Sequence, residues 1–407
     1  MTRHRPGSEP LPPCYALTLP GLEEIAAEEI TDDLGGEVKR TARGLVVFRV
    51  PAIDRTLLEL RTVEDVFVLA WGTDKLSYRA DALDSIRRWT AREADWDRLL
   101  RLHHAVRPKP KGRPTYRLVT QMTGEHGFRR IDAREALAAG LAGKLPASWR
   151  HVEEGAAVEI WLTIHGATAV CGVRLSDRTM RHRTYKREHL PASLRPTLAA
   201  AMVRLGSIRP GQVVLDPMCG AGTILAEQLQ RWGRPLTPHP SPPEGERGGF
   251  SFPLSPASGE RGGFSFPLSP ASGERGRGEG GARAWGGDLD PAAVRAASIN
   301  LRRLGPVLLA RWDAARLPLP DQSVDCILSN PPFGKQLGRP EEIGFLYRRV
   351  LPQYDRVLRP GGRAVLLVSD PAALKEAAAA VGWKRERQFR VEVLGQPAFL
   401  SAWRKPG

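Results

Sequence analysis

The chain has few cysteines and no long apolar run. Its 407 residues include four cysteines, Cys14, Cys171, Cys219 and Cys326, which lie far apart and form no C-x-x-C pair. This spacing gives little support to a disulfide framework or a zinc site, and we expect no bound metal. No stretch reaches the ~18 apolar residues of a membrane-spanning helix. The amino terminus is charged and interrupted by proline, so we expect a soluble, cytoplasmic protein.

Acidic residues are scarce relative to basic ones. Lysine and arginine number 60 against 45 aspartates and glutamates, which gives a formal net charge of +15. Such a surplus favours a polyanionic partner, nucleic acid first of all, although a basic protein without such a partner stays open. The length suffices for two or three domains.

The pattern of the first half predicts two small α+β units, residues 1–75 and 76–178. Its expected strands cover residues 15–18, 44–50, 65–70, 115–121, 156–164 and 167–175. Helices are expected from residue 22, over residues 82–89 and over residues 131–145. The last two strands are close enough for a hairpin through His165 and Gly166. Residues 179–206 form a linker and a helix, which we expect to begin at Pro196 and to end at Gly206.

Strands and helices alternate regularly from residue 207 to 407, which predicts an α/β fold with a mostly parallel sheet and helices on both faces. One segment interrupts the alternation, because Gly245 to Ser258 is repeated letter for letter as Gly259 to Ser272. Exact repetition of Gly-, Pro- and Ser-rich sequence predicts a disordered insertion at about 237–283. Without its roughly 47 residues, Asp288 would follow Gly222 by about 19 residues, the spacing of a ribose-binding acid.

A glycine-rich turn, Gly220-Ala221-Gly222, follows a buried strand that ends at Asp216. In α/β sheets such a turn receives a nucleoside cofactor, and the absence of a third glycine and of a phosphate cradle favours a cofactor without phosphates. Asp216 could hold the cofactor or orient the turn. Asp288 ends the next strand and could accept both ribose hydroxyls, although a turn or N-cap role is the alternative. Asp313 follows a strand over 307–311 and could accept the adenine amine or be an exposed loop acid.

The sequence Asn330-Pro331-Pro332-Phe333 follows a further strand, over residues 324–328. An amine conjugated to a heteroaromatic ring is a poor nucleophile because its lone pair is delocalised. The Asn330 side-chain oxygen and the Pro331 carbonyl can each accept one N–H of such an amine and turn its lone pair toward a methyl donor. The prolines fix the backbone, and Phe333 offers a flat face for a base lifted from its stack. An ordinary turn after a strand is the alternative.

Together these motifs resemble the class I S-adenosylmethionine-dependent methyltransferases with an Asn/Asp-Pro-Pro-aromatic motif. Residues 15–23, 124–132 and 183–199 are similar to segments of the THUMP-containing RNA methyltransferases. The resemblance implies a ferredoxin-like domain (1–75), a THUMP RNA-binding domain (76–178) and a Rossmann-like methyltransferase domain (207–407). It also implies S-adenosyl-L-methionine as cofactor and tRNA as substrate. We expect the protein to be a monomer. The N2 amine of guanine 6, in the acceptor stem, is the best match, and guanine 10 is the near rival.

The resemblance assigns Asn330, Pro331, Pro332 and Phe333 to the target guanine. Phe333 departs from the commoner Tyr and keeps stacking without a hydroxyl. The implied cofactor-binding residues are Thr197, Asp216, Met218, Cys219, Gly220, Ala221, Gly222, Thr223, Asp288, Leu289, Asp313, Ala314 and Asn330. Candidate RNA contacts form two basic clusters, a loop with Arg107, Lys109, Lys111 and Arg113 and a group near the domain junction with Arg181, Arg183, Lys186 and Arg187.

Two other functions stay open at this point. A DNA methyltransferase acting on adenine N6 or cytosine N4 uses the same four-residue motif, but it would need a domain that reads duplex edges, and the upstream half suits RNA shape better. A non-enzymatic RNA-binding protein with a decayed methyltransferase domain is the second alternative. The intact Asp216, Asp288, Asp313 and Asn330 argue against decay.

Overall fold

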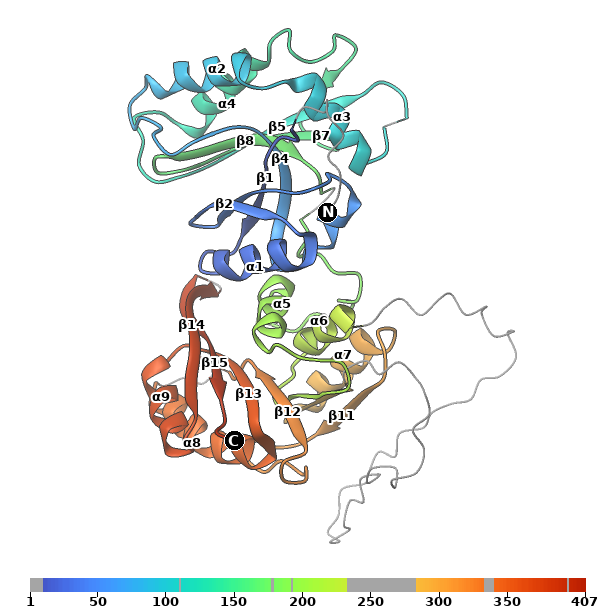
Figure 1. Ribbon diagram of the computed structural model, residues 1–407, viewed down its shortest axis with the longest axis vertical. Helices are drawn as coiled ribbons and strands as arrows, with labels where there is room; N and C mark the ends of the chain where they lie inside the picture. The colour runs from blue at the N-terminus through green and yellow to red at the C-terminus, as the bar shows by residue number, and fades with distance from the viewer. Residues whose placement is uncertain are drawn as a thin grey trace, which may run out of the picture.

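The computed structural model describes residues 10–109, 111–176, 179–191, 193–232, 283–332, 340–393 and 395–407. It contains an eight-stranded sheet in the first half of the chain and a seven-stranded sheet in the second (Figure 1). Phe333 and nearly all of the predicted insertion lie outside the described residues. The last residue assigned to the insertion, Arg283, begins a strand instead, which corrects the predicted boundary.

One sheet runs through the whole first half, in the order β2-β3-β1-β4-β8-β7-β5-β6. Its central strand β4 pairs with β1 on one side and β8 on the other, so the two predicted units share a sheet. Their division near residue 75, just after β4 ends, stays a prediction. The strands are β1 (Cys14–Thr18), β2 (Glu37–Ala42), β3 (Leu45–Arg49), β4 (Val63–Thr73), β5 (Thr115–Thr123), β6 (Arg150–His151), β7 (Val158–His165) and β8 (Thr168–Arg174).

The helices of the first half cover this sheet at two places. Figure 1 shows α2 and α4 side by side at the end of the molecule farthest from the second sheet, and α1 on the side that faces it. The expected hairpin between β7 and β8 is confirmed. The helix expected over 131–145 ends earlier, at Leu141. The helical segments are α1 (Glu23–Leu34), a 3-10 helix η1 (Arg55–Glu59), α2 (Ala82–Arg92), α3 (Trp96–Val106) and α4 (Arg130–Leu141).

The second sheet has the order β11-β10-β9-β12-β13-β15-β14. Its strands from β11 to β13 are parallel, so the predicted mostly parallel sheet is confirmed. The strand β15 is antiparallel to both of its neighbours, which the alternating pattern did not indicate. The strand order reverses direction at β9, and such a switch point opens a crevice at the strands' carboxyl ends. The strands are β9 (Val213–Asp216), β10 (Arg283–Asp288), β11 (Val307–Arg311), β12 (Val324–Ser329), β13 (Leu358–Val368), β14 (Lys384–Val393) and β15 (Gln396–Arg404).

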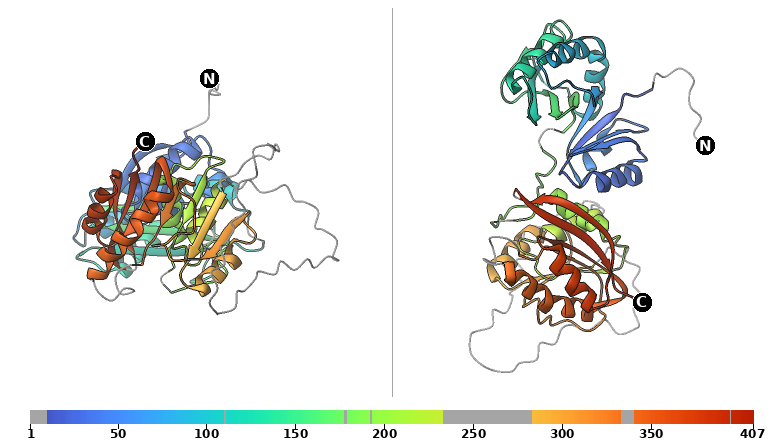
Figure 2. Two further views of the ribbon diagram at one scale, coloured as in Figure 1. Left: turned by 90° about the horizontal axis from the view of Figure 1, so that it is seen from below. Right: turned by 90° about the vertical axis from the view of Figure 1, so that its left-hand side faces the viewer.

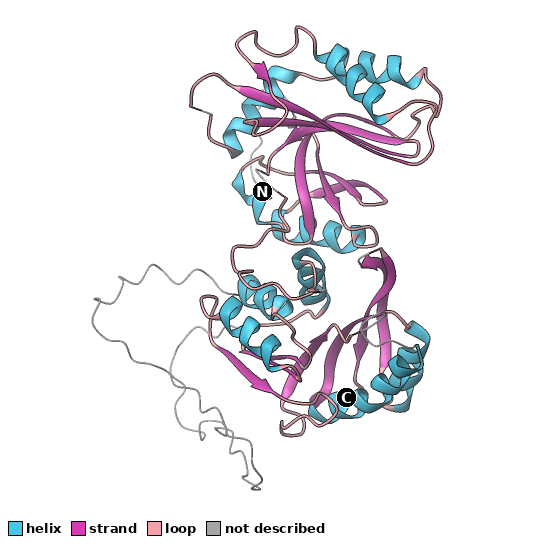
Figure 3. Ribbon diagram, turned by 180° about the vertical axis from the view of Figure 1, so that it is seen from behind, coloured by secondary structure: helices cyan, strands magenta, loops and turns pink. Residues whose placement is uncertain are grey.

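Helices cover both faces of the second sheet, and each face has its own apolar core (Figure 3). The first three helices pack together on one face and the last two on the other. As predicted, Pro196 begins α5 and Gly206 caps it. The helices are α5 (Pro196–Leu205), α6 (Thr223–Trp232), α7 (Pro291–Leu301), α8 (Pro340–Val357) and α9 (Pro371–Ala380). None of the described helices is both long and apolar enough to cross a membrane.

The two halves are joined by a shared apolar core. Leu22 and Ile25 at α1 are fully buried in the same cluster as Leu198 and Met202 of α5. In Figure 2 the blue helix α1 of the first half lies next to the green helix α5 of the second. Apolar interfaces of this kind hold domains in one arrangement more firmly than polar ones do. The contact is close enough that a Cβ on Gly21 would lie 1.9 Å from the carbonyl oxygen of Arg390 in β14.

Candidate active site

Four polar side chains that follow four neighbouring strands line one cavity. Asp216 ends β9, Asp288 ends β10, Asp313 lies beyond β11 and Asn330 lies beyond β12. The cavity has a volume of about 590 Å³, which falls in the range of small-molecule sites. Because the carboxyl ends of parallel strands meet at one edge, motifs far apart in the sequence come together here.

Most of the predicted cofactor residues line this cavity, and two do not. Gly222 (φ +76°) lies behind it, where an added Cβ would come within 2.9 Å of the Leu301 side chain, so this glycine lets the turn pack against α7. Thr197 is fully buried in α5 and is not part of the lining. The predicted residues that do line the cavity are Asp216, Met218, Cys219, Gly220, Ala221, Thr223, Asp288, Leu289, Asp313, Ala314, Asn330 and Pro332.

The glycine-rich turn is held by Asp288. The N–H of Gly220, which has a left-handed backbone (φ +51°), donates to Asp288 Oδ2 at 2.9 Å. The other carboxylate oxygen of Asp288 accepts the N–H of Asp290 at 3.0 Å. Asp290 in turn caps α7. Each carboxylate oxygen retains a lone pair, so Asp288 can both shape the turn and accept hydroxyl groups from a ligand.

Asp216 is a buried carboxyl group with few hydrogen bonds to offset the cost of its burial. Its side chain is 1% exposed, and Oδ1 accepts the N–H of Met218 at 3.3 Å. Its Oδ2 has no hydrogen-bond partner among the described residues. Burial, together with the charge of Asp288, raises the pKa of Asp216 well above its usual range. A buried acceptor without a partner in a cavity favours a ligand that brings a donor, above all a cationic one.

Asn330 contributes a second acceptor of this kind. Its Oδ1 is buried and finds no partner in the part of the chain that the structure describes. The residue follows β12 directly, and Pro331 beside it is buried. The amide oxygen is therefore available to an N–H group of a bound molecule.

Sequence analysis missed six residues of the cavity wall that come from other parts of the chain. Arg349 of α8 lies 3.5 Å from Asp313 and stacks over the ring of Phe345 at 5.6 Å. No short motif marks these positions, because the fold alone brings α8 and the linker before α5 to the edge of the sheet. These six residues are Leu190, Pro191, Ser193, Leu194, Leu346 and Arg349. Four further lining residues lie close to predicted positions and were also missed, namely Pro217, Ile224, Asp290 and Ala293.

In the basic cluster at the domain junction, some side chains make internal contacts and others are exposed. Arg183 donates to Glu227 at 3.0 Å and to the Arg61 carbonyl at 2.9 Å, and its side chain is 11% exposed. Lys186 donates to the Leu194 carbonyl at 3.0 Å. Arg181 pairs with Glu64 at 3.5 Å, and Arg187 is exposed. Arg183 is therefore committed to internal contacts, whereas Arg187 is open to a partner.

The other basic cluster surrounds the end of α3. Arg107 caps that helix, Lys109 and Lys111 are exposed, and the Arg113 guanidinium donates to the Ser148 carbonyl at 2.8 Å. The segment after Arg107 is a loop, as expected. RNA binding by these residues stays a prediction.

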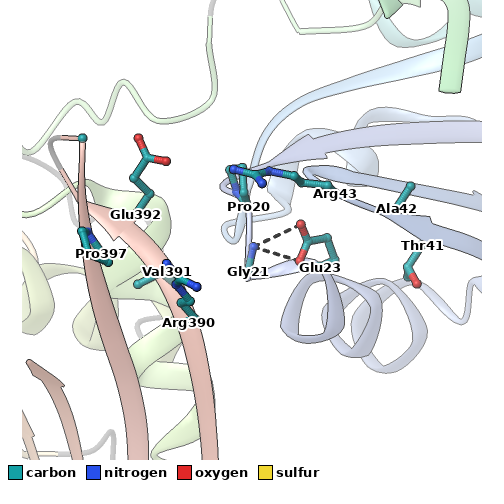
Figure 4. A pocket seen from close by; sticks show the side chains of 11 residues that line it. Pro20, Gly21, Glu23, Thr41, Ala42, Arg43, Arg390, Val391, Glu392 and Pro397 are labelled. Carbon is teal, nitrogen blue, oxygen red and sulfur yellow. Dashed lines mark hydrogen bonds between the residues drawn. The ribbon is translucent and has the colours of Figure 1, made fainter. Parts of the chain in front are cut away.

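A further cavity, of about 530 Å³, lies between the two halves (Figure 4). Its lining combines Arg43 and Arg390 with Glu392 and with Glu23, and the Glu23 carboxylate already accepts the N–H of Gly21 at 2.9 Å. It shares no lining residue with the cavity at the four strand ends. Among the described residues, no group of three or more His, Cys, Asp or Glu side chains could hold a metal ion.

Comparison with known families decides the class of protein. The family model of the RMKL-like methyltransferase domain matches residues 183–396, more than half of the chain. The chain belongs to this methyltransferase family. The match spans α5, the whole cavity and most of the second sheet, so the class I methyltransferase fold expected from the motifs is confirmed.

Individual relatives of this methyltransferase extend the match to the first half. A tRNA (guanine(6)-N2)-methyltransferase of Thermus thermophilus is 29% identical over 368 residues, which cover 89% of this chain and 90% of the relative. The bovine tRNA (guanine(6)-N(2))-methyltransferase THUMP3 is 29% identical over 255 residues, 58% of this chain and 41% of that relative. The crystal structure of TrmN from Thermus thermophilus superposes with a TM-score of 0.69 at 26% identity, covering 97% of this chain and 99% of that one.

Proposed function

We propose that this methyltransferase transfers a methyl group from S-adenosyl-L-methionine to the N2 amine of guanine 6 in the acceptor stem of tRNA. The observation that carries the proposal is the pair of buried acceptors, Asp216 Oδ2 and Asn330 Oδ1, which line one cavity and have no partner among the described residues. The Thermus and bovine relatives, whose names give guanine 6 of tRNA, support the substrate.

The residues at the strand ends fit the donor groups of the cofactor. Asp216 would accept the ammonium of its amino-acid end, Asp288 the ribose hydroxyls and Asp313 the adenine amine. The turn around Gly220 leaves room for the nucleoside because no side chain projects there. When bound, S-adenosyl-L-methionine supplies an electrophilic methyl group on a sulfonium.

Asn330 prepares the target amine for attack. Its Oδ1 would accept one N–H of the guanine amine, and the Pro331 carbonyl would accept the other, which fixes the direction of the nitrogen lone pair. No general base is required before transfer, because the amine proton can leave to water afterwards. Positioning supplies most of the rate in such a site.

The first half would bind the RNA. Its predicted ferredoxin-like and THUMP units, residues 1–75 and 76–178, share one sheet, and an apolar core joins this half to the methyltransferase domain. The net charge of +15 favours association with the phosphate backbone, and the exposed Lys109, Lys111 and Arg187 are the residues we assign to it. We further propose that the protein acts as a monomer in the cytoplasm, where its tRNA substrate is processed.

Inosine substitution tests the target atom directly. Inosine is guanosine without the 2-amino group, so a tRNA with inosine at position 6 keeps its fold but loses the nucleophile. We expect methyl transfer from labelled S-adenosyl-L-methionine to unmodified tRNA, recovered as N2-methylguanosine, and none to the inosine-6 tRNA. A tRNA with inosine at position 10 is the matched control and should be methylated normally.

The reverse result, with transfer lost at inosine 10 and kept at inosine 6, would move the target to guanine 10. Label in methyladenosine or methylcytidine, or on duplex DNA alone, would contradict the proposed substrate. Binding of tRNA without any transfer would favour the non-enzymatic alternative.

Asn330→Ala tests the role of the amide. We expect kcat to fall by about a hundredfold or more, because the lone pair of the amine is no longer directed, while the Kd for S-adenosyl-L-methionine changes little. Single-turnover kinetics and calorimetric titration measure the two quantities. A variant that loses cofactor binding in proportion to its activity would show that Asn330 holds the cofactor instead of the guanine.

A further inference from the structure

The wall of the cofactor cavity includes part of the linker that connects the two halves. Leu190, Pro191, Ser193 and Leu194 line it together with residues of the glycine-rich turn. The described linker residues from 179 to 195 belong to no helix or strand. Helix or strand hydrogen bonds therefore do not hold this part of the wall in place. A backbone turn joins the Ser193 N–H to the Leu190 carbonyl at 3.1 Å, and side chains tie the segment to the rest of the protein.

Asn300, near the end of α7, makes four hydrogen bonds that provide this support. Its side chain is 3% exposed. Oδ1 accepts the N–H groups of Arg187 at 2.8 Å and Glu188 at 2.9 Å. Nδ2 donates to the carbonyl of Glu188 at 3.1 Å and to the carbonyl of Ala221 at 2.9 Å. One side chain thus ties the linker to the glycine-rich turn across the cavity wall.

Two other contacts hold linker residues close to those that Asn300 binds. Upstream, Tyr185 donates to the buried Glu227 of α6 at 2.6 Å, which anchors the linker before Arg187. Downstream, Lys186 donates to the Leu194 carbonyl at 3.0 Å, which draws the far end of the segment back toward its start. Between these anchors, Asn300 joins the linker by hydrogen bonds to the Ala221 carbonyl of the turn that carries Gly220, and Tyr185 shares an apolar cluster with Cys219 of the same turn.

We propose that Asn300 is a positioning residue for the cofactor site, which holds the linker residues around Leu190 as a preformed wall of the cavity. The proposal rests on the proposed function for the identity of the cofactor. Asn300 itself is not part of the cavity lining, so it acts through the segments that it holds. A preformed wall raises the affinity for a ligand, because binding then causes no further loss of conformational entropy in the linker.

Asn300→Ala removes all four bonds and Asn300→Asp keeps the acceptor for the two linker N–H groups. We expect Asn300→Ala to raise the Kd for S-adenosylhomocysteine by tenfold or more, about 1.4 kcal/mol. Asn300→Asp should raise it at least as much, because its second carboxylate oxygen would be buried against the carbonyl oxygens of Glu188 and Ala221. The KM for S-adenosyl-L-methionine should rise with a smaller change in kcat. Hydrogen exchange at the Arg187 and Glu188 amides should accelerate in the alanine variant and stay slower in the aspartate variant.

Ser401→Ala is the matched control for a general loss of stability. Ser401 is 2% exposed, lies in β15 away from the cavity and accepts the Trp403 indole N–H at 2.9 Å. We expect this variant to lower Tm while Kd and exchange at residues 187 and 188 stay at wild-type values. A Kd of Asn300→Ala within about twofold of wild type would overturn the proposal, as would an equal rise in Kd for Ser401→Ala. Failure of the wild-type protein to bind S-adenosylhomocysteine would instead contradict the proposed function.

Discussion

Replacing Asp216 with asparagine should stabilise the free protein and weaken its binding of the cofactor. The carboxylate is 1% exposed, one of its oxygens has no partner within the described ranges, and the other receives one N–H at 3.3 Å. A polar group buried without a partner costs about 1–3 kcal/mol, and a charged one costs more. Asparagine keeps the shape of the side chain and still places a polar atom at the unpartnered position, so the expected gain comes only from removing the charge.

We therefore expect the free energy of unfolding of Asp216→Asn to rise by about 1–3 kcal/mol near neutral pH, which corresponds to about 2–4 °C in Tm per kcal/mol for a domain of this size. The cofactor Kd should rise by about 10- to 100-fold, because the ammonium loses its counter-charge. Thermal unfolding without ligand and calorimetric titration with S-adenosylhomocysteine measure the two effects.

The stability difference should depend on pH in a defined direction. Burial raises the pKa of Asp216 in the folded state, so the folded protein retains a proton that the unfolded chain has lost. Wild-type stability then falls as pH rises through the raised pKa, and the variant lacks this loss. The Tm difference should be small at acidic pH, where the unfolded chain also holds the proton, and should grow as pH rises through the raised pKa.

Asp325→Asn provides the contrast, because that carboxylate accepts the Val213 N–H at 2.7 Å and pairs with Arg359 at 2.5 Å. Its replacement should destabilise the protein. A less stable Asp216→Asn that binds cofactor as wild type does would refute the reasoning.

Two further predictions concern the junction between the halves. Gly21→Ala should lower Tm strongly, because its Cβ would lie 1.9 Å from the Arg390 carbonyl. Gly35 also has a left-handed backbone (φ +61°) but open space around it, so Gly35→Ala should cost only about 1–2 kcal/mol of stability. Equal losses of stability in the two variants would show that the close contact is unimportant. Glu227→Gln should lower the free energy of unfolding, measured in urea, by about 3–5 kcal/mol, because Arg61 and Arg183 lose their buried charged partner. Glu386→Gln, at the partly exposed ion pairs with Arg363 and Arg404, should lower it by about 1 kcal/mol or less. Similar losses in the two variants would contradict the role of burial.

Elements with a clear apolar period were predictable from the sequence, and elements without one were not. The turn after β9 and the Asn330 motif were placed correctly because local patterns of strand, glycine and proline specify them. The strand β2 was missed because its side chains are mostly exposed and show no apolar alternation. The helix α3 was missed although Asp95 caps it and Leu99 and Leu100 are buried.

The sequence by itself determined the chemistry of the site, because each strand end carries its own acid or amide and the residues that shape it are local. The sequence pattern alone predicts that the four polar residues of the cavity lie at strand ends, namely Asp216, Asp288, Asp313 and Asn330. Only the tertiary structure decided what surrounds them. The linker around Leu190, the support from Asn300 and the pairing of Arg349 with Asp313 depend on contacts between residues distant in the chain. Such contacts follow from how whole elements pack, and no local periodicity encodes them.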